Sequence, residues 1–398
     1  MERVSSFAGN RRLFLVLLFN FAIFGVTVAI IGATVPKVIR QFEWSYLSTG
    51  MVVSASSVGY FASSFVAGLL IHRVGTKKVL VSGILIQACG LAFFGVSPTV
   101  IANLAAALMM GLGQGGTEVV TNFCVVRMEK PGQSRLMTLM HAAFPVGAIL
   151  GPVLIGWLIA AGRSWQEMFR AMSVVCLAMA GGFAFLSFGS LDAKREELGH
   201  ARVPGLMRSP LFLFMVLTIL LYVGSEIGVS AWVGEYYVKV FGSPASTGAY
   251  MVSVFWAGIL AGRLLVSIGY RGYRQAELLL FVCCLSAVFL AAALSMESPL
   301  TSGAGFLACG LVFSAIYPVV MALTGHHFEN AQSMAIGIVS TAGGVGSFAS
   351  PFAMAAIANA YGIRTGFLFY IATTVGMVAS AAAVLYLVRR GKRPGKPS

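Results

Sequence analysis

The chain has 398 residues, of which 58% are hydrophobic and only 10% are charged, and its mean hydropathy is +0.88. An average soluble domain carries about 25% charged residues, so this composition excludes an ordinary soluble domain and predicts a membrane protein. The formal net charge of +14 requires no nucleic-acid partner, because Lys and Arg also accumulate in the cytoplasmic loops of membrane proteins.

Apolar runs of about 20 residues, the length that crosses a hydrocarbon core about 30 Å thick, recur along the chain. Twelve membrane spans are predicted, over 13–35, 47–71, 79–96, 101–126, 136–161, 168–188, 211–238, 247–268, 276–294, 302–324, 333–360 and 365–388. The first span is followed by further spans and by no small-residue cleavage site, so we interpret it as a retained helix and not as a signal peptide.

The longest polar connection, 192–209, divides the spans into two groups of six. We therefore predict a six-helix half over 1–190, a cytoplasmic linker over 191–210, and a second half over 211–398 that ends in a short basic tail. Of the 27 Lys and Arg residues, 21 fall on the side that holds both termini. This bias predicts cytoplasmic termini and a location in a plasma membrane, here a bacterial inner membrane.

The loop after the 47–71 span contains a spaced set of small and basic residues: Gly68, His72, Arg73, Gly75, Lys77 and Lys78. It resembles the cytoplasmic signature of the major facilitator superfamily, Gly-x3-Asp-Arg-x-Gly-[Arg/Lys]-[Arg/Lys], which latches the two halves of the protein on the inner side. The resemblance implies a gating role for these residues. His72 stands where the family has an acid, and a neutral imidazole cannot make the same ion pair, so a pH-sensitive gate is an alternative.

Glu118 is a carboxylate inside the 101–126 span, which carries no other charge. An ionised side chain at the bilayer centre costs about 2.5 to 3.5 kcal/mol on insertion scales, and such residues usually mark proton, ion or substrate paths. Desolvation disfavours the charged form, so the group can carry a proton near neutral pH. Asn122, one helical turn below, and Gln114 are predicted to contact a solute. A structural hydrogen bond to a neighbouring helix is the alternative for Glu118.

The 136–161 span contains His141, which is interpreted either as a packing residue or as a proton relay, and which is also a candidate for solute binding. The same span carries Gly147-x3-Gly151-Pro152, which resembles a motif of drug and proton antiporters and favours export as the alternative direction. Helix packing through small residues explains these glycines equally well.

The 211–238 span carries a second acid, Glu226, which we predict to take part in proton coupling. Tyr222, one turn before it on the same helix face, is predicted to contact the solute. Trp232 is interpreted either as a residue that lines the cavity or as a packing residue. Aromatic and acidic residues near the end of this span are expected at the membrane interface: Glu235, Tyr236 and Tyr237. Three residues of other spans are further candidates for solute binding: Asn20, Gln87 and Trp256.

Three motifs resemble the fucose permease group of sugar and proton symporters, and they read Gly113-x-Gly115-x2-Glu118-x3-Asn122, His141-x2-Phe144-x2-Gly147 and Tyr222-x-Gly224-x-Glu226-x5-Trp232. The fucose permease also carries an Asp four residues before a proline in its first span. Here that proline is Pro36 and the aligned position is Gly32, so the acid is missing. Glu226 is predicted to replace it.

An internal repeat accompanies these motifs. Gly147-x4-Pro152 is matched by Gly346-x4-Pro351, and a second pair of glycines, Gly68 and Gly75, is matched by Gly262 and Gly269. Two related six-helix halves are typical of the superfamily. We therefore predict an all-α polytopic membrane protein with twelve transmembrane helices, arranged as two six-helix pseudo-repeats around a central cavity.

The predicted function is secondary active transport of a small polar solute, with a sugar as the expected class, by proton-coupled symport with alternating access. Sodium coupling, and proton-driven export of amphipathic or lipid-like compounds, are the alternatives. An enzyme is not expected, since His326-His327 beside Glu329 is the only weak candidate site and no nucleotide-binding loop appears. We expect a monomer in the lipid bilayer with neither metal nor cofactor, and all six cysteines lie inside apolar spans.

Overall fold

The computed structural model of the chain describes residues 7–129, 135–191, 205–269 and 274–391, and all regular structure in these ranges is helical. The α-helices are α1 (Phe7–Phe42), α2 (Tyr46–Val74), α3 (Thr76–Phe93), α4 (Val100–Met128), α5 (Arg135–Ala160), α6 (Gln166–Phe185), α7 (Pro210–Val240), α8 (Ala245–Gly269), α9 (Gln275–Ser295), α10 (Pro299–Phe313), α11 (Ile316–His327), α12 (Gln332–Tyr361) and α13 (Ile363–Gly391). Three short 3-10 helices are η1 (Gly189–Leu191), η2 (Leu206–Arg208) and η3 (Glu329–Ala331).

Twelve helical spans in these ranges are long and apolar enough to cross a membrane, which confirms the predicted number. Most of the predicted linker and the end of the basic tail lie outside the described residues. One predicted boundary is wrong, because α1 continues through Pro36 to Phe42 where the sequence indicated an end at Val35. A proline removes one hydrogen bond from a helix, and here the packed helix tolerates that loss.

The predicted 302–324 span consists of two helices, α10 and α11, with a turn at Ser314 and Ala315 between them. Pro318 accounts for this break. Its ring nitrogen has no hydrogen to donate to the carbonyl four residues earlier, that of Ser314, so the helix lacks one hydrogen bond across the turn. The two helices together still form one membrane span, Pro299–His327.

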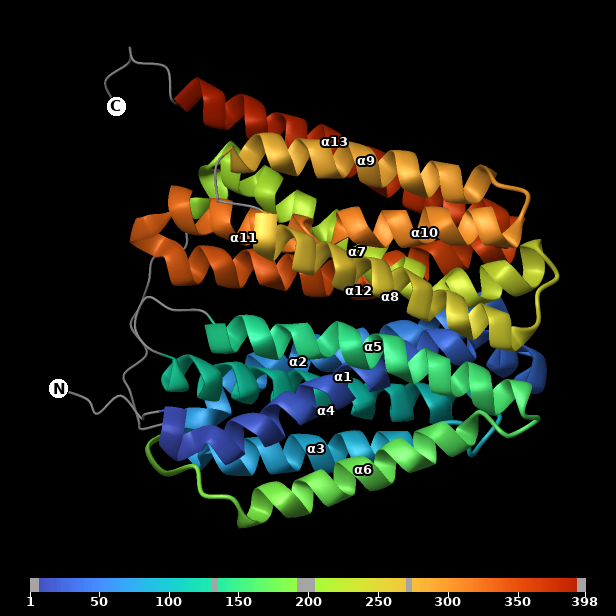
Figure 1. Cartoon of the computed structure of the whole chain (residues 1–398), viewed down its shortest axis with the longest axis horizontal. Coiled ribbons are helices and arrows are strands. Elements are labelled where there is room, and N and C mark those ends of the chain that lie inside the picture. Colours follow the sequence, from blue (N-terminus) through green and yellow to red (C-terminus); the bar gives the residue numbers. More distant parts are fainter. Residues whose placement is uncertain (1–6, 130–134, 192–204, 270–273, 392–398) are drawn as a thin grey trace. The chain divides into compact units, whose positions relative to one another are not determined.

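The chain forms two compact units. Unit 1 comprises Met1–Leu198 and Ala231–Ser253, and unit 2 comprises Gly199–Ser230 and Val254–Ser398, so α7 and α8 each contribute to both. Within unit 1, α1 packs along α5, α2 and α3 pack on α4, and α6 packs on α3 (Figure 1). Within unit 2, α9 packs on α10 and α13, and α12 packs on α13.

Glycines permit the closest helix contacts, and they repeat between the units. In unit 1, a Cβ at Gly147 would collide with the Ala22 carbonyl on α1, and a Cβ at Gly111 would collide with the Ser56 carbonyl on α2. Such small residues let helix backbones approach closely in membrane proteins. The matching glycines 199 residues later make the same kind of contact within unit 2, Gly346 with the Leu220 carbonyl and Gly310 with the Phe255 carbonyl.

The partners of these glycines follow the same spacing. Gly25 on α1 faces α5 and Gly59 on α2 faces α4, while Gly224 and Gly258 occupy the corresponding places in unit 2. The predicted match between Gly68 and Gly262 is wrong as a packing equivalence: no atom lies within 4 Å of a Cβ built at Gly68, whereas one at Gly262 would collide with the Leu311 carbonyl.

Candidate functional site

The carboxyl group of Glu118 lies half-buried on α4 and is bound by a neighbouring helix. The Tyr60 hydroxyl of α2 donates a hydrogen bond of 2.6 Å to Glu118 Oε2, and the Asn122 side chain also hydrogen-bonds to Glu118. Asn122 Oδ1 is buried and has no hydrogen-bond partner in the described part of the chain. The structure therefore brings the predicted Glu118 and Asn122 together and adds Tyr60, which the sequence analysis missed.

Helix approach explains why Tyr60 reaches this acid. Gly115, one turn before Glu118, has no side chain, and a Cβ there would collide with the Tyr60 carbonyl. The spacing of Gly111 and Gly115 on α4, with Gly59 on α2, is the small-residue pattern that brings two membrane helices together. This glycine pattern was the sequence signal that could have indicated a partner for Glu118 on the 47–71 span.

Aromatic rings of unit 1 continue from Tyr60 toward α1 and α5. The Phe24 ring is stacked on that of Tyr60, with centroids 6.1 Å apart and planes at 10°, and Phe144 meets Phe24 edge-on at 5.0 Å. His141 is half-buried on α5, and its ring meets Phe21 edge-on at 5.1 Å. The predicted His141 therefore lies in the same aromatic cluster that covers the Tyr60 ring.

Gln114 lies in a separate buried network. Its Nε2 donates to Thr27 Oγ1 at 3.1 Å, and Gln87 Nε2 donates to the same oxygen at 2.9 Å. The Thr27 hydroxyl in turn donates to the Phe24 carbonyl at 3.0 Å. These bonds join α1, α3 and α4, and Asn20 is also buried on α1.

The second predicted acid has its own cluster, in unit 2. The Tyr222 hydroxyl donates a hydrogen bond of 2.7 Å to Glu226 Oε1, and both residues are buried on α7. Arg263 of α8 acts electrostatically on both groups. Tyr317 of α11 acts on Tyr222, and its hydroxyl lies 3.2 Å from Ser340 Oγ. Arg263 lies inside the predicted 247–268 span, and the sequence analysis did not single it out as a site residue.

The aromatic and acidic residues after Glu226 differ from the prediction. Glu235, Tyr236 and Tyr237 were expected at the membrane interface, but each is at most 1% exposed within the protein. The two tyrosine rings pack against Phe241, with centroids 5.9 and 5.1 Å away, and Glu235 binds Tyr46. Protein contacts therefore take the place of lipid headgroups here.

Two tryptophans of the predicted solute site are wholly packed. Trp256 is 1% exposed and its Nε1 donates to Ser230 Oγ at 2.7 Å. Trp232 is 0% exposed, and its ring meets that of Tyr46 at 5.9 Å. Its Nε1 has no hydrogen-bond partner among the residues that the structure describes. Trp232 thus keeps an unused donor, whereas Trp256 does not.

The predicted gating residues lie at the junction of α2 and α3. Gly75 ends α2 with a φ of 95°, a region that favours glycine. His72 meets the Phe123 ring edge-on at 6.1 Å, and the Arg127 guanidinium lies 4.3 Å from the centre of the same ring. Lys77 Nζ donates to the Ala184 carbonyl of α6. Gly68 faces open space, and Arg73 and Lys78 are exposed.

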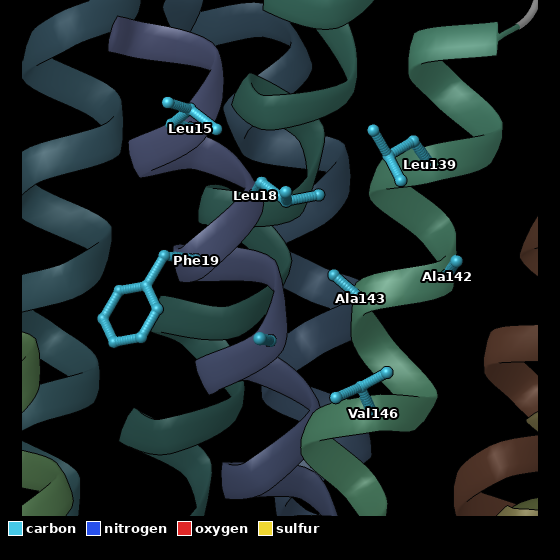
Figure 2. Close-up of a pocket in the computed structure, with 8 residues that line it drawn as sticks. Leu15, Leu18, Phe19, Leu139, Ala142, Ala143 and Val146 are labelled. Carbon is cyan, nitrogen blue, oxygen red and sulfur yellow. The ribbon is translucent and has the colours of Figure 1, made fainter.

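A groove of about 360 Å³ lies between α1 and α5 in unit 1 (Figure 2). Its lining is entirely apolar and consists of Leu15, Leu18, Phe19, Ala22, Leu139, Ala142, Ala143 and Val146. Such a lining offers a polar solute no hydrogen bond. In the described ranges, no group of three or more His, Cys, Asp or Glu side chains could hold a metal ion.

Comparisons with known proteins identify the family. The sequence profile of the Major Facilitator Superfamily matches residues 17–330 and 278–398. The chain belongs to this superfamily. Membrane protein MosC of Rhizobium meliloti is 22% identical to this superfamily member over 394 residues, which are 99% of this chain and 95% of MosC. The chain is therefore a major facilitator superfamily transporter.

Solved structures share the fold of this superfamily member. The nucleoside transporter NupG matches with a TM-score of 0.80 at 11% identity, over 94% of this chain and 99% of NupG. A D-xylose-proton symporter matches with a TM-score of 0.72 at 14% identity, over 93% of this chain and 96% of the symporter. The finer resemblance to the fucose permease group stays a prediction.

Proposed function

We propose that this transporter moves a small polar solute, with a sugar as the expected class, together with a proton. The observation that carries the proposal is the Glu118 carboxyl group, held inside a membrane span by Tyr60 and Asn122. Both neighbours are uncharged, so the acid can exist in either protonation state without breaking an ion pair. A group of this kind in a membrane helix is suited to carry a proton.

Solute binding would complete the cluster. The unpartnered Asn122 Oδ1 can accept a hydrogen bond from a solute hydroxyl, and satisfying a buried acceptor is favourable. The Phe24 and Phe144 rings beside Tyr60 provide apolar surface of the sort that lines small-molecule sites. If the solute binds more tightly to one protonation state of Glu118, the two binding events are thermodynamically linked, and this linkage couples the fluxes.

Glu226 is the second acid of the proposal, in a different electrostatic setting. Arg263 of α8 acts electrostatically on this buried carboxyl group, so the two protonation states of Glu226 differ in their interaction with a cation. Glu118 has only neutral donors among its stated partners. We therefore assign the coupling proton to Glu118 and a charge-compensated supporting role to Glu226.

The export alternative loses its main support. It rested on the Gly147 and Gly151 motif of α5, and both glycines contact α1: Gly147 at the Ala22 carbonyl and Gly151 at Val26 and Ile30. Helix packing accounts for these residues without a further function. Import is thus the direction we propose, in a plasma membrane with both termini cytoplasmic, as the Lys and Arg distribution predicts.

Proton-driven accumulation tests the proposal. The purified transporter in lipid vesicles is expected to accumulate at least one labelled sugar from a panel when the outside is made acidic, because an inward proton gradient drives a symporter. A protonophore is expected to abolish the accumulation, and a sodium gradient alone is expected to give none. Accumulation driven by sodium, or solute efflux against the proton gradient, would contradict proton symport.

Tyr60→Phe is expected to move the pH profile of gradient-driven uptake toward higher pH by about one pH unit. The variant loses a hydroxyl that donates to the carboxylate, and a hydrogen bond to a charged group contributes about 1.5 to 3 kcal/mol, part of which a water molecule can replace. Uptake of a labelled solute by vesicles between pH 5 and 9 measures the profile. Tyr386→Phe, at an exposed position, is the matched control and is expected to leave the profile unchanged.

A further inference from the structure

Glu235 is a wholly buried acid that the proposed transport cycle does not use. It lies on α7 in the part of that helix that belongs to unit 1, and its exposure is 0%. The Tyr46 hydroxyl of α2 donates to Glu235 Oε1 at 3.2 Å. The other carboxyl oxygen, Oε2, is buried and has no hydrogen-bond partner among the described residues.

Three titratable or charged side chains act on this carboxyl group. They are Tyr46 of α2, Arg40 near the end of α1, and Lys239 one turn later on α7. Both cations are exposed, so solvent and salt screen their attraction for an ionised Glu235. Trp232, one turn earlier on α7, meets the ring of the same Tyr46 edge-on at 5.9 Å.

Because Glu235 Oε2 has no hydrogen-bond partner among the described residues, the stability of the contact between α2 and α7 depends on whether Glu235 is protonated. A buried ionised carboxylate with one oxygen that accepts no hydrogen bond is far more costly than a buried neutral acid. Opening the contact between α2 and α7 would admit water, which hydrates the anion. The packed arrangement therefore binds a proton more tightly than the opened one, and proton release favours opening.

We propose that Glu235 is a second proton-binding site, which holds a proton while α7 is packed on α2 and releases it when this contact opens. The proton leaves to solvent, and no other bond changes. The inference goes beyond the solute-coupled proton of Glu118, because it requires no solute and lies on a different helix. It gives this end of unit 1 a pH-dependent conformational equilibrium of its own.

Hydrogen–deuterium exchange of the full-length transporter in lipid nanodiscs, without solute, tests this inference. Peptides covering 231–243 are followed between pH 5 and 9, with each rate corrected for the intrinsic exchange rate at that pH. In the wild type, protection of this segment is expected to fall as pH rises, by up to tenfold per pH unit for one linked proton. Glu235→Gln, a neutral mimic of the protonated acid, is expected to remain protected at every pH.

Matched variants distinguish Glu235 from other causes of a pH-dependent exchange rate. Glu297→Gln removes an exposed acid and is expected to keep the wild-type pH dependence, as is Glu118→Gln, so a failure of the Glu118 proposal leaves this test intact. If Glu235→Gln does not fold, Glu235→Met serves as a second neutral variant. Unchanged pH dependence in the neutral variant, or flat protection in the wild type, would overturn the inference.

Discussion

Glu118→Gln is expected to abolish accumulation driven by a pH gradient while retaining exchange of solute across the vesicle membrane. The amide keeps the size of the protonated acid and can still meet the Tyr60 hydroxyl that now binds Oε2. It cannot release a proton. Exchange needs only the loaded carrier to reorient, whereas net symport requires Glu118 to deprotonate before the empty carrier returns.

Two vesicle measurements check this prediction. One follows counterflow of a labelled solute into vesicles preloaded with unlabelled solute, and the other follows uptake after an acid jump outside. Glu297→Gln, at an exposed position on the α9–α10 connection, is the control for removing an acid and is expected to behave as the wild type in both. Normal acid-driven uptake by Glu118→Gln would show that Glu118 does not carry the coupling proton. Glu226 would then be the candidate proton carrier, or sodium the candidate coupling ion.

Gly147→Ala is expected to lower the thermal stability of the protein strongly. A Cβ at this position would overlap the Ala22 carbonyl oxygen and lie 2.9 Å from the Val26 amide nitrogen, both on the backbone of α1. Backbone atoms in a helix cannot change rotamer as a side chain can, so the new Cβ forces α1 and α5 apart where they are in contact. Overpacking of this kind costs about 1 to 3 kcal/mol and occasionally more. The melting temperature in detergent is the readout.

Gly182→Ala is the matched control, in the interior of α6. No atom lies within 4 Å of a Cβ built at Gly182, and alanine is favoured over glycine in a helix by about 1 kcal/mol. This variant is expected to melt at or slightly above the wild-type temperature. If Gly147→Ala melted normally but lost transport, the α5 glycines would have a functional role beyond packing.

The number of membrane spans could be predicted because the length of each apolar run can be read from the sequence without knowing which helices pack together. The repeat was only partly predictable. Gly147 and Gly346 were matched through their shared spacing to a proline, and the structure shows both in equivalent helix contacts. Gly68 and Gly262 are each followed by a second glycine at the same spacing, but only Gly262 packs against another helix. Spacing along the chain does not determine which face of a helix another helix covers.

The candidate site shows the same limit. Glu118 and Asn122 could be placed together because residues four apart share a helix face. Tyr60 and Phe24 come from other helices, so their place depends on which helices pack together. Glu235 was expected at the membrane interface because it lies near the end of an apolar run, whereas the structure buries it against Tyr46 of another helix.

The turn at Ser314 and Ala315 interrupts a membrane span of unit 2, the unit that also contains the buried Glu226. An unbroken helix resists bending because each tilt stretches hydrogen bonds, but here Pro318 has already removed the bond across the turn. The hydroxyl of Tyr317, two residues past the turn, lies 3.2 Å from Ser340 Oγ. Tyr317 also acts electrostatically on Tyr222, which donates a hydrogen bond to Glu226. The start of α11, which carries Tyr317, can therefore bend at less energetic cost than an unbroken helix would.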